Sequence, residues 1–195
     1  IVAGHSVGRK GRVYSIEPAE VIYSRLKSNI EYNQMSQIEP IRLALSDEAG
    51  DVNLTVVGEG YSAWSSLGNT IDDKTTAVEK VESITLDGFV ASRKLEGKID
   101  FIKIDVEGWE KHVLQGGSTV LSRQNAPNIM IEFTEENACR NKTTCESLYD
   151  ILISYGYKLF VYEYDEHKLR EIGKEEDFTC CNVICTKDGR TLSGF

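Results

Sequence analysis

The fold is decided by the stretch Ile99-Asp100-Phe101-Ile102-Lys103-Ile104-Asp105-Val106-Glu107-Gly108, which predicts the strongest strand of the chain over residues 99–106. Alternate residues of a strand share a face. The even-numbered residues from 102 to 106 are apolar, whereas Lys103 and Asp105 share the opposite face. A lysine within a buried sheet is costly unless it is paired, so we expect Asp105 or Glu107 to pair with Lys103. Gly108 then allows the chain to turn sharply into a helix.

Helices and strands are predicted to alternate on both sides of this stretch. The further predicted strands lie at residues 13–16, 41–45, 52–57, 81–86, 129–133, 158–164 and 180–185, and the predicted helices lie at residues 18–34, 87–95, 109–122 and 148–155. No helical pattern separates the last two strands, which allows them to pair as a hairpin. The alternation predicts an α/β fold with a mainly parallel sheet and an antiparallel terminal strand.

Composition limits the class of protein. The chain has 195 residues, which predicts a single domain over residues 1–195, and its residues 58–78 are rich in Gly, Ser and Thr, as in a surface loop. The 22 Lys and Arg residues against 31 Asp and Glu residues give a net charge of −9. This charge disfavours nucleic acid and anionic membranes as partners but not a small cationic cofactor. No apolar run of about 18 residues predicts a membrane span.

The five cysteines do not predict a metal site. None of them forms a C-x-x-C pair, and histidines are scarce. Cys139 and Cys145 flank a polar loop and would form a disulfide in an oxidising compartment. We favour reduced thiols, and we expect the protein to act in the cytoplasm.

Candidate functional residues lie where strands end, because ligands of open α/β sheets bind beyond the carboxyl ends of the strands. Glu17 ends the first predicted strand, where it can bind ribose hydroxyls or simply favour a helix N-terminus. Asp105 and Glu107 can act as a general base or bind a metal, or form a structural salt bridge. If the strand of Glu132 lies beside that of Asp105, the two acids approach each other and would raise a pKa or hold a divalent ion.

Several motifs, taken in order, resemble the FkbM family of S-adenosylmethionine-dependent methyltransferases. They are residues 11–18 (Gly-Arg-Val-Tyr-Ser-Ile-Glu-Pro), residues 44–50 (Ala-Leu-Ser-Asp-Glu-Ala-Gly), residues 85–87 (Thr-Leu-Asp), the Lys-Ile-Asp-Val-Glu-Gly-x-Glu core that ends at Glu110, and residues 131–133 (Ile-Glu-Phe). The resemblance implies a class I methyltransferase (Rossmann-like) fold.

The family's first strand and its D-x-G-A-N-x-G loop have no counterpart here, and the chain begins at Ile1 rather than Met. We therefore expect an N-terminally truncated domain.

The resemblance also implies a set of roles. Glu17 is expected to bind the ribose of S-adenosylmethionine, and Ala44, Leu45 and Ser46 are expected to lie near its adenine. Asp105 and Glu107 are expected near the transferred methyl group, and Lys103 is a further candidate catalytic residue. The expected acceptor is a hydroxyl on a sugar or natural product, that is, a small molecule or a glycan.

The expected reaction is in-line displacement at the methyl carbon, which a base would assist. Asp105 is the first candidate for the base and Glu107 the second. No metal is expected, although a Mg²⁺-assisted variant through Asp105 and Glu132 is a weaker hypothesis. Two other interpretations stay open: a non-catalytic methyltransferase-like binding module, and a nicotinamide-dependent Rossmann enzyme with an acid in the same ribose role. The oligomeric state is open.

Overall fold

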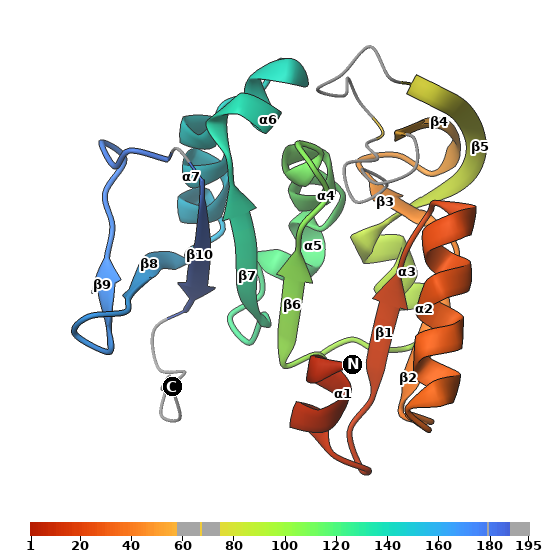
Figure 1. Cartoon of the computed structure of the whole chain (residues 1–195). Helices are drawn as coiled ribbons and strands as arrows, with labels where there is room; N and C mark the ends of the chain where they lie inside the picture. The colour runs from red at the N-terminus through yellow and green to blue at the C-terminus, as the bar shows by residue number, and fades with distance from the viewer. Residues whose placement is uncertain (58–66, 68–74, 179, 188–195) are drawn as a thin grey trace. The chain divides into compact units, whose positions relative to one another are not determined.

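Strands and helices divide between two units along the chain (Figure 1). The structure is a computed structural model that describes residues 1–57, 67, 75–178 and 180–187. The first unit contains Ile1–Leu45 and Ala49–Ile84, and the second contains Ser46–Glu48 and Thr85–Phe195. The interpretation of residues 1–195 as one domain stays a prediction.

The first unit holds two small sheets. Its elements are α1 (Val2–Val7), β1 (Val13–Ile16), α2 (Glu20–Tyr32), β2 (Ile38–Ile41), β3 (Ala44–Ser46), β4 (Gly50–Val57) and β5 (Thr75–Thr85). Strands β1 and β2 pair in parallel, β4 and β5 pair antiparallel, and β5 lies between β3 and β4. One apolar cluster contains Ala19, Ala44, Leu54 and Val81, and these side chains join the start of α2 to the second sheet.

The second unit is built around one mixed sheet in the order β6-β7-β10-β8-β9, as Figure 1 shows. Its strands are β6 (Phe101–Ile104), β7 (Asn128–Phe133), β8 (Lys158–Glu163), β9 (Lys168–Glu171) and β10 (Cys181–Thr186). The β6–β7 pair is parallel, whereas β10 is antiparallel to both β7 and β8. Every second residue of β7 is fully buried, namely Ile129, Ile131 and Phe133, so β7 forms the centre of this core.

The helices of the second unit are α3 (Leu86–Ser92), α4 (Glu110–Gly116), α5 (Ser118–Leu121), α6 (Glu135–Arg140) and α7 (Cys145–Ser154). Helix α7 begins at Thr144, whose side chain and that of Ser147 each bond the other's backbone N–H in a capping box. Leu148 and Leu152 are then buried one turn apart. No helix within the described ranges has the length and apolar character needed to cross a membrane.

The α/β prediction is confirmed, and several of its details are corrected. The sheets are mixed rather than mainly parallel, since parallel pairing occurs at β1–β2 and β6–β7 and the other registered pairs are antiparallel. The predicted strand over residues 41–45 is wrong in its bounds, because β2 ends at Ile41 and β3 begins at Ala44. Strands β8 and β10 pair antiparallel, but they do not form the expected hairpin, because β9 lies between them along the chain and itself pairs with β8. Neither β9 nor α6 was predicted.

The predicted helix over residues 109–122 is two helices. The carboxylate of Asp87 accepts hydrogen bonds from the backbone N–H groups of Thr119 and Val120, both at 2.8 Å. These donors would otherwise bond carbonyls of a continuous helix, so their capture by Asp87 starts a new helix after Gly117.

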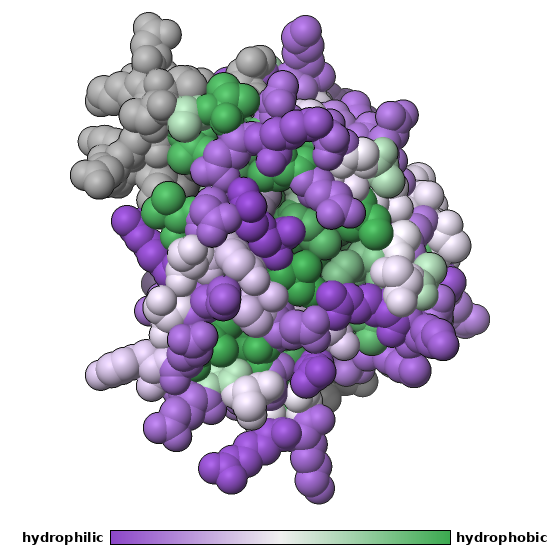
Figure 2. Space-filling view, turned by 90° about the vertical axis from the view of Figure 1, so that its right-hand side faces the viewer, coloured by the Kyte–Doolittle hydropathy of each residue, from purple (hydrophilic) through white to green (hydrophobic). Residues whose placement is uncertain are grey.

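The predicted surface loop over residues 58–78 lies mostly outside the described residues. Its last four residues belong to β5, and Leu67 packs against the apolar cluster of the first unit. All five cysteines are free, as the reduced interpretation expected. On the face drawn in Figure 2, hydrophilic residues surround smaller groups of hydrophobic ones.

Candidate functional site

Three carboxylates meet at the carboxyl ends of β6 and β7. Asp105 and Glu107 follow β6, and Glu132 lies in β7. The parallel register pairs Ile104 with Ile131, which places the next residues of the two strands side by side. One carboxylate oxygen from each of the three acids lies within 4.8 Å of the others. The predicted approach of Glu132 to Asp105 is therefore confirmed.

Lys103 and Asp105 form an ion pair, as the alternation of the strand predicted. Their side chains are 49% and 44% exposed, so this face of β6 is open to solvent rather than buried. An exposed ion pair contributes little to stability. The pair instead places one positive charge beside the three carboxylates. Oxygens this close suit a shared proton or a divalent cation.

Glu107 occupies an unusual position for a glutamate. Its backbone φ is 53°, a left-handed conformation that few residues other than glycine adopt. Its Oε2 accepts a hydrogen bond of 3.0 Å from Nδ2 of Asn137. Burial raises the pKa of Glu107 to about 7, and the nearby charges of Glu132 and Asp105 act in the same direction. A carboxylate with this pKa can exchange a proton near neutral pH.

The turn that carries Glu107 is held from two sides. Glu110 is only 4% exposed, and its Oε1 accepts hydrogen bonds from the backbone N–H groups of Val106 at 3.1 Å and Gly108 at 3.3 Å. A Cβ on Gly108 would lie 2.4 Å from the carbonyl oxygen of Asn137, so only glycine fits against α6. Glu110, the last residue of the Lys-Ile-Asp-Val-Glu-Gly-x-Glu core, thus stabilises the turn through hydrogen bonds from its backbone N–H groups.

Glu17 lies at the carboxyl end of β1 in the first unit, as predicted. Its Oε1 accepts a hydrogen bond of 2.8 Å from the backbone N–H of Ala19, at the start of α2. Burial raises the pKa of Glu17, the hydrogen bond from Ala19 opposes that shift, and the charge of Glu79 adds to it. Ala19 also packs with Ala44 in the apolar cluster. The structure therefore links two of the predicted cofactor-binding residues through Ala19.

The residues of β3 divide between its two faces. Ala44 and Ser46 are buried and Leu45 is half-buried, so the side chain of Leu45 is the most accessible of the three. The hydroxyl of Ser46 accepts a hydrogen bond of 3.1 Å from the indole N–H of Trp109 and donates one of 2.9 Å to Asp47. Trp109 also stacks on His112, with ring centroids 3.7 Å apart. The hydroxyl of Ser46 is thus hydrogen-bonded to other side chains of the protein.

A family model described as the methyltransferase FkbM domain matches residues 2–159. The chain belongs to this family. The chain aligns over 93% of its length with a crystal structure of methyltransferase FkbM from Methylobacillus flagellatus KT, with 16% sequence identity and a TM-score of 0.51. The chain spans 41% of that protein. No curated protein matches it.

The family match and the solved structure confirm the class I methyltransferase-like α/β fold, and the family is that of the methyltransferase FkbM domain. The matched range contains all the predicted site residues, from Glu17 to Glu132. Their individual roles stay predictions.

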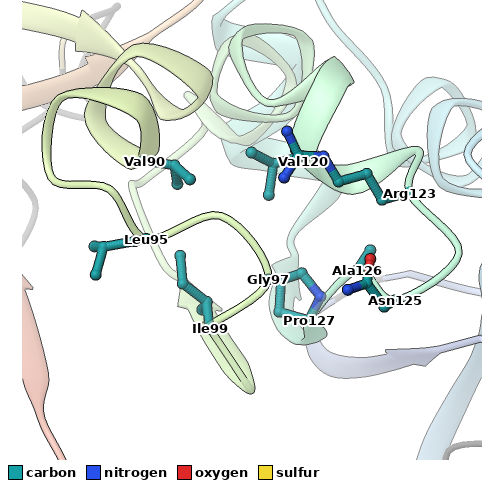
Figure 3. A pocket seen from close by; sticks show the side chains of 9 residues that line it. All are labelled: Val90, Leu95, Gly97, Ile99, Val120, Arg123, Asn125, Ala126 and Pro127. Atoms are coloured by element: carbon teal, nitrogen blue, oxygen red, sulfur yellow. The ribbon is translucent and has the colours of Figure 1, made fainter.

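The chain also has a small hollow, partly open to solvent, at the opposite edge of the same sheet. Figure 3 shows the side chains that line it, among them the apolar Val90, Leu95 and Val120 and the charged Arg123. Its residues 97–99 precede β6 and residues 125–127 precede β7. The hollow thus lies at the amino ends of these strands, away from the carboxylates, and we assign no chemistry to it.

Proposed function

We propose that the protein is an S-adenosylmethionine-dependent methyltransferase that methylates a hydroxyl group on a small molecule or glycan. One observation carries the proposal: in a chain of the FkbM family, Glu107 lies with Asp105 and Glu132 at the carboxyl ends of β6 and β7, where burial raises its pKa to about 7. A hydroxyl is a poor nucleophile until a base takes its proton, and a base works best when its pKa lies near the ambient pH.

Glu17 is the proposed ribose contact. The Ala19 N–H fixes one oxygen of its carboxylate, Oε1, and we assign Oε2 to the ribose. A half-buried carboxylate of fixed orientation can accept hydrogen bonds from ribose hydroxyls, so it fits the cofactor. Leu45 offers an apolar side chain for contact with adenine, whereas Ala44 and Ser46 would contribute mainly backbone atoms. Bound S-adenosylmethionine supplies an electrophilic methyl group.

Glu107 is the proposed general base. The acceptor hydroxyl gives its proton to the Glu107 carboxylate while its oxygen forms a bond to the methyl carbon and the carbon–sulfur bond breaks. Asp105 and Lys103 neutralise each other in their ion pair, so they suit contact with the acceptor better than proton transfer. This assignment reverses the order of Asp105 and Glu107 that the sequence favoured.

The proposal also covers the compartment in which the reaction occurs and the charge of its reactants. Five free cysteines fit a reducing compartment such as the cytoplasm. The net charge of −9 fits a cationic methyl donor and an uncharged acceptor better than a nucleic acid.

The test uses the full-length protein with S-adenosylmethionine labelled in its methyl group and a panel of sugars and other hydroxyl compounds. We expect label transfer to a hydroxyl, and we expect Glu107→Gln to lower kcat at least about 100-fold, the usual range for loss of a general base. Glu17→Gln is expected to weaken S-adenosylmethionine binding about tenfold, as loss of charge-assisted hydrogen bonds does. Glu31→Gln, on the exposed far end of α2, is the matched control.

Each alternative predicts a different result. Binding of S-adenosylmethionine without transfer to any acceptor would favour a non-catalytic binding module. Binding of a nicotinamide cofactor in competition with S-adenosylmethionine would favour a dehydrogenase. Full activity of Glu107→Gln would remove Glu107 as the base and return that role to Asp105.

A further inference from the structure

Helix α6 lies against the turn that carries Glu107. Asn137 of this helix is buried, with 8% exposure, and its Nδ2 donates the 3.0 Å hydrogen bond to Oε2 of Glu107. The backbone carbonyl of Asn137 accepts a hydrogen bond of 3.2 Å from Nδ2 of Asn141. The same carbonyl excludes any side chain at position 108. Asn137 therefore contacts both residues of the turn, Glu107 through its side chain and Gly108 through its backbone.

The orientation of the Asn137 amide is fixed by Arg140. Nη1 of Arg140 donates a hydrogen bond of 2.8 Å to Oδ1 of Asn137. A guanidinium has donors but no acceptors, so the amide oxygen must face Arg140. The amide nitrogen must then face the Glu107 carboxylate. Arg140 itself is mostly covered, with an 18% exposed side chain, and it also pairs with Glu136.

We propose that Asn137, oriented by Arg140, is the positioning residue that holds the Glu107 carboxylate in place for the acceptor hydroxyl. The inference rests on the proposed function of Glu107. By holding Oε2, the amide fixes the rotation of the carboxylate and therefore the place of its other oxygen. Misplacement of a reacting group by about 1 Å can cost about 100-fold in rate.

A neutral amide suits this role better than a charged donor. The charged groups around Glu107 come from four elements and the turn itself: Lys103 of β6, Asp105 after it, Glu110 of α4, Glu132 of β7 and Arg140 of α6. A cation in direct contact with Glu107 would stabilise its ionised form and weaken it as a base. Asn137 donates a hydrogen bond without adding a charge, and Arg140 donates to the oxygen of the same amide.

The test compares kcat and KM of the full-length wild type, Asn137→Ala and Glu136→Gln. Asn137→Ala is expected to lower kcat at least about tenfold while KM for S-adenosylmethionine changes less than about threefold, because Asn137 is not one of the proposed cofactor contacts. Glu136→Gln is the matched control: it removes the exposed end of the Arg140 ion pair on the same helix and should leave kcat within about twofold. A kcat of Asn137→Ala within twofold of the wild type would overturn the proposal.

Two further measurements cover other outcomes. If Asn137→Ala does not fold, Arg140→Met tests the same role, because it frees the amide to rotate; an unchanged kcat overturns the proposal and a selective loss of kcat supports it. If the wild type transfers no methyl group, the proposed function is wrong. Crystal structures of the wild type and of Asn137→Ala then test the positioning alone, and an unmoved Glu107 carboxylate would overturn it.

Discussion

Replacement of Gly108 with alanine is expected to destabilise the protein strongly. The backbone φ of Gly108 is 95°, which residues with a Cβ adopt only at a cost of about 1–2 kcal/mol. The new Cβ would lie 2.3 Å from Nδ2 of Asn141 and 2.4 Å from the carbonyl oxygen of Asn137. Because the second contact is with backbone, it cannot be relieved by a side-chain rotation. Overpacking of this kind costs about 1–3 kcal/mol.

The expected loss for Gly108→Ala is therefore about 2–5 kcal/mol, or a fall of about 1–2 M in the urea midpoint followed by circular dichroism. Gly97→Ala separates the two causes. Gly97 also has a positive φ, of 68°, but a Cβ there would meet only Nδ2 of Asn125 at 3.4 Å. Its expected loss is about 1 kcal/mol. If Gly108→Ala loses no more stability than Gly97→Ala, the inference that the Glu107 turn packs closely against α6 is refuted.

Three other changes test the second unit. Burial raises the pKa of Glu107 to about 7, so the folded state binds a proton more tightly than the unfolded state, and stability should fall as pH rises from about 4.5 to 7. Glu107→Gln should flatten this fall in urea titrations by about 1 kcal/mol, allowing for solvent screening. Asp87→Ala should cost about 1–2 kcal/mol, because α5 loses its N-terminal acceptor, and the exposed Asp100→Ala should cost much less. Trp109→Phe should cost about 1 kcal/mol in thermal unfolding, because the hydroxyl of Ser46 loses its indole donor.

The regular elements could be predicted where one local pattern decided them. Strand β7 has apolar residues at every second position, and the structure buries those same residues. Helix α7 has its apolar residues at helical spacing, and it lies where the pattern placed it. In both cases the pattern reports burial, and burial decides the element.

The break between α4 and α5 could not be predicted in this way. The apolar positions continue through Gly117, so the periodicity alone indicates one helix. The break depends on Asp87, which lies 32 residues from the N–H group of Thr119 that it binds. The sequence shows the motif Thr85-Leu86-Asp87, but not what the carboxylate of Asp87 contacts. A capping residue supplied from a distant element leaves no local signal.

The candidate site also combines residues that the sequence pattern predicted with one residue that it did not. Alternation along β6 placed Lys103 and Asp105 on one face, and their ion pair confirms that placement. The same alternation would continue to Glu107, but the strand ends at Ile104 and Glu107 turns into a left-handed conformation. From there the position of its carboxylate depends on Asn137, thirty residues later in a helix that no pattern predicted. The chemistry-bearing acids were therefore visible in the sequence, whereas the neutral residue that orients one of them became visible only once the fold had brought α6 against the turn.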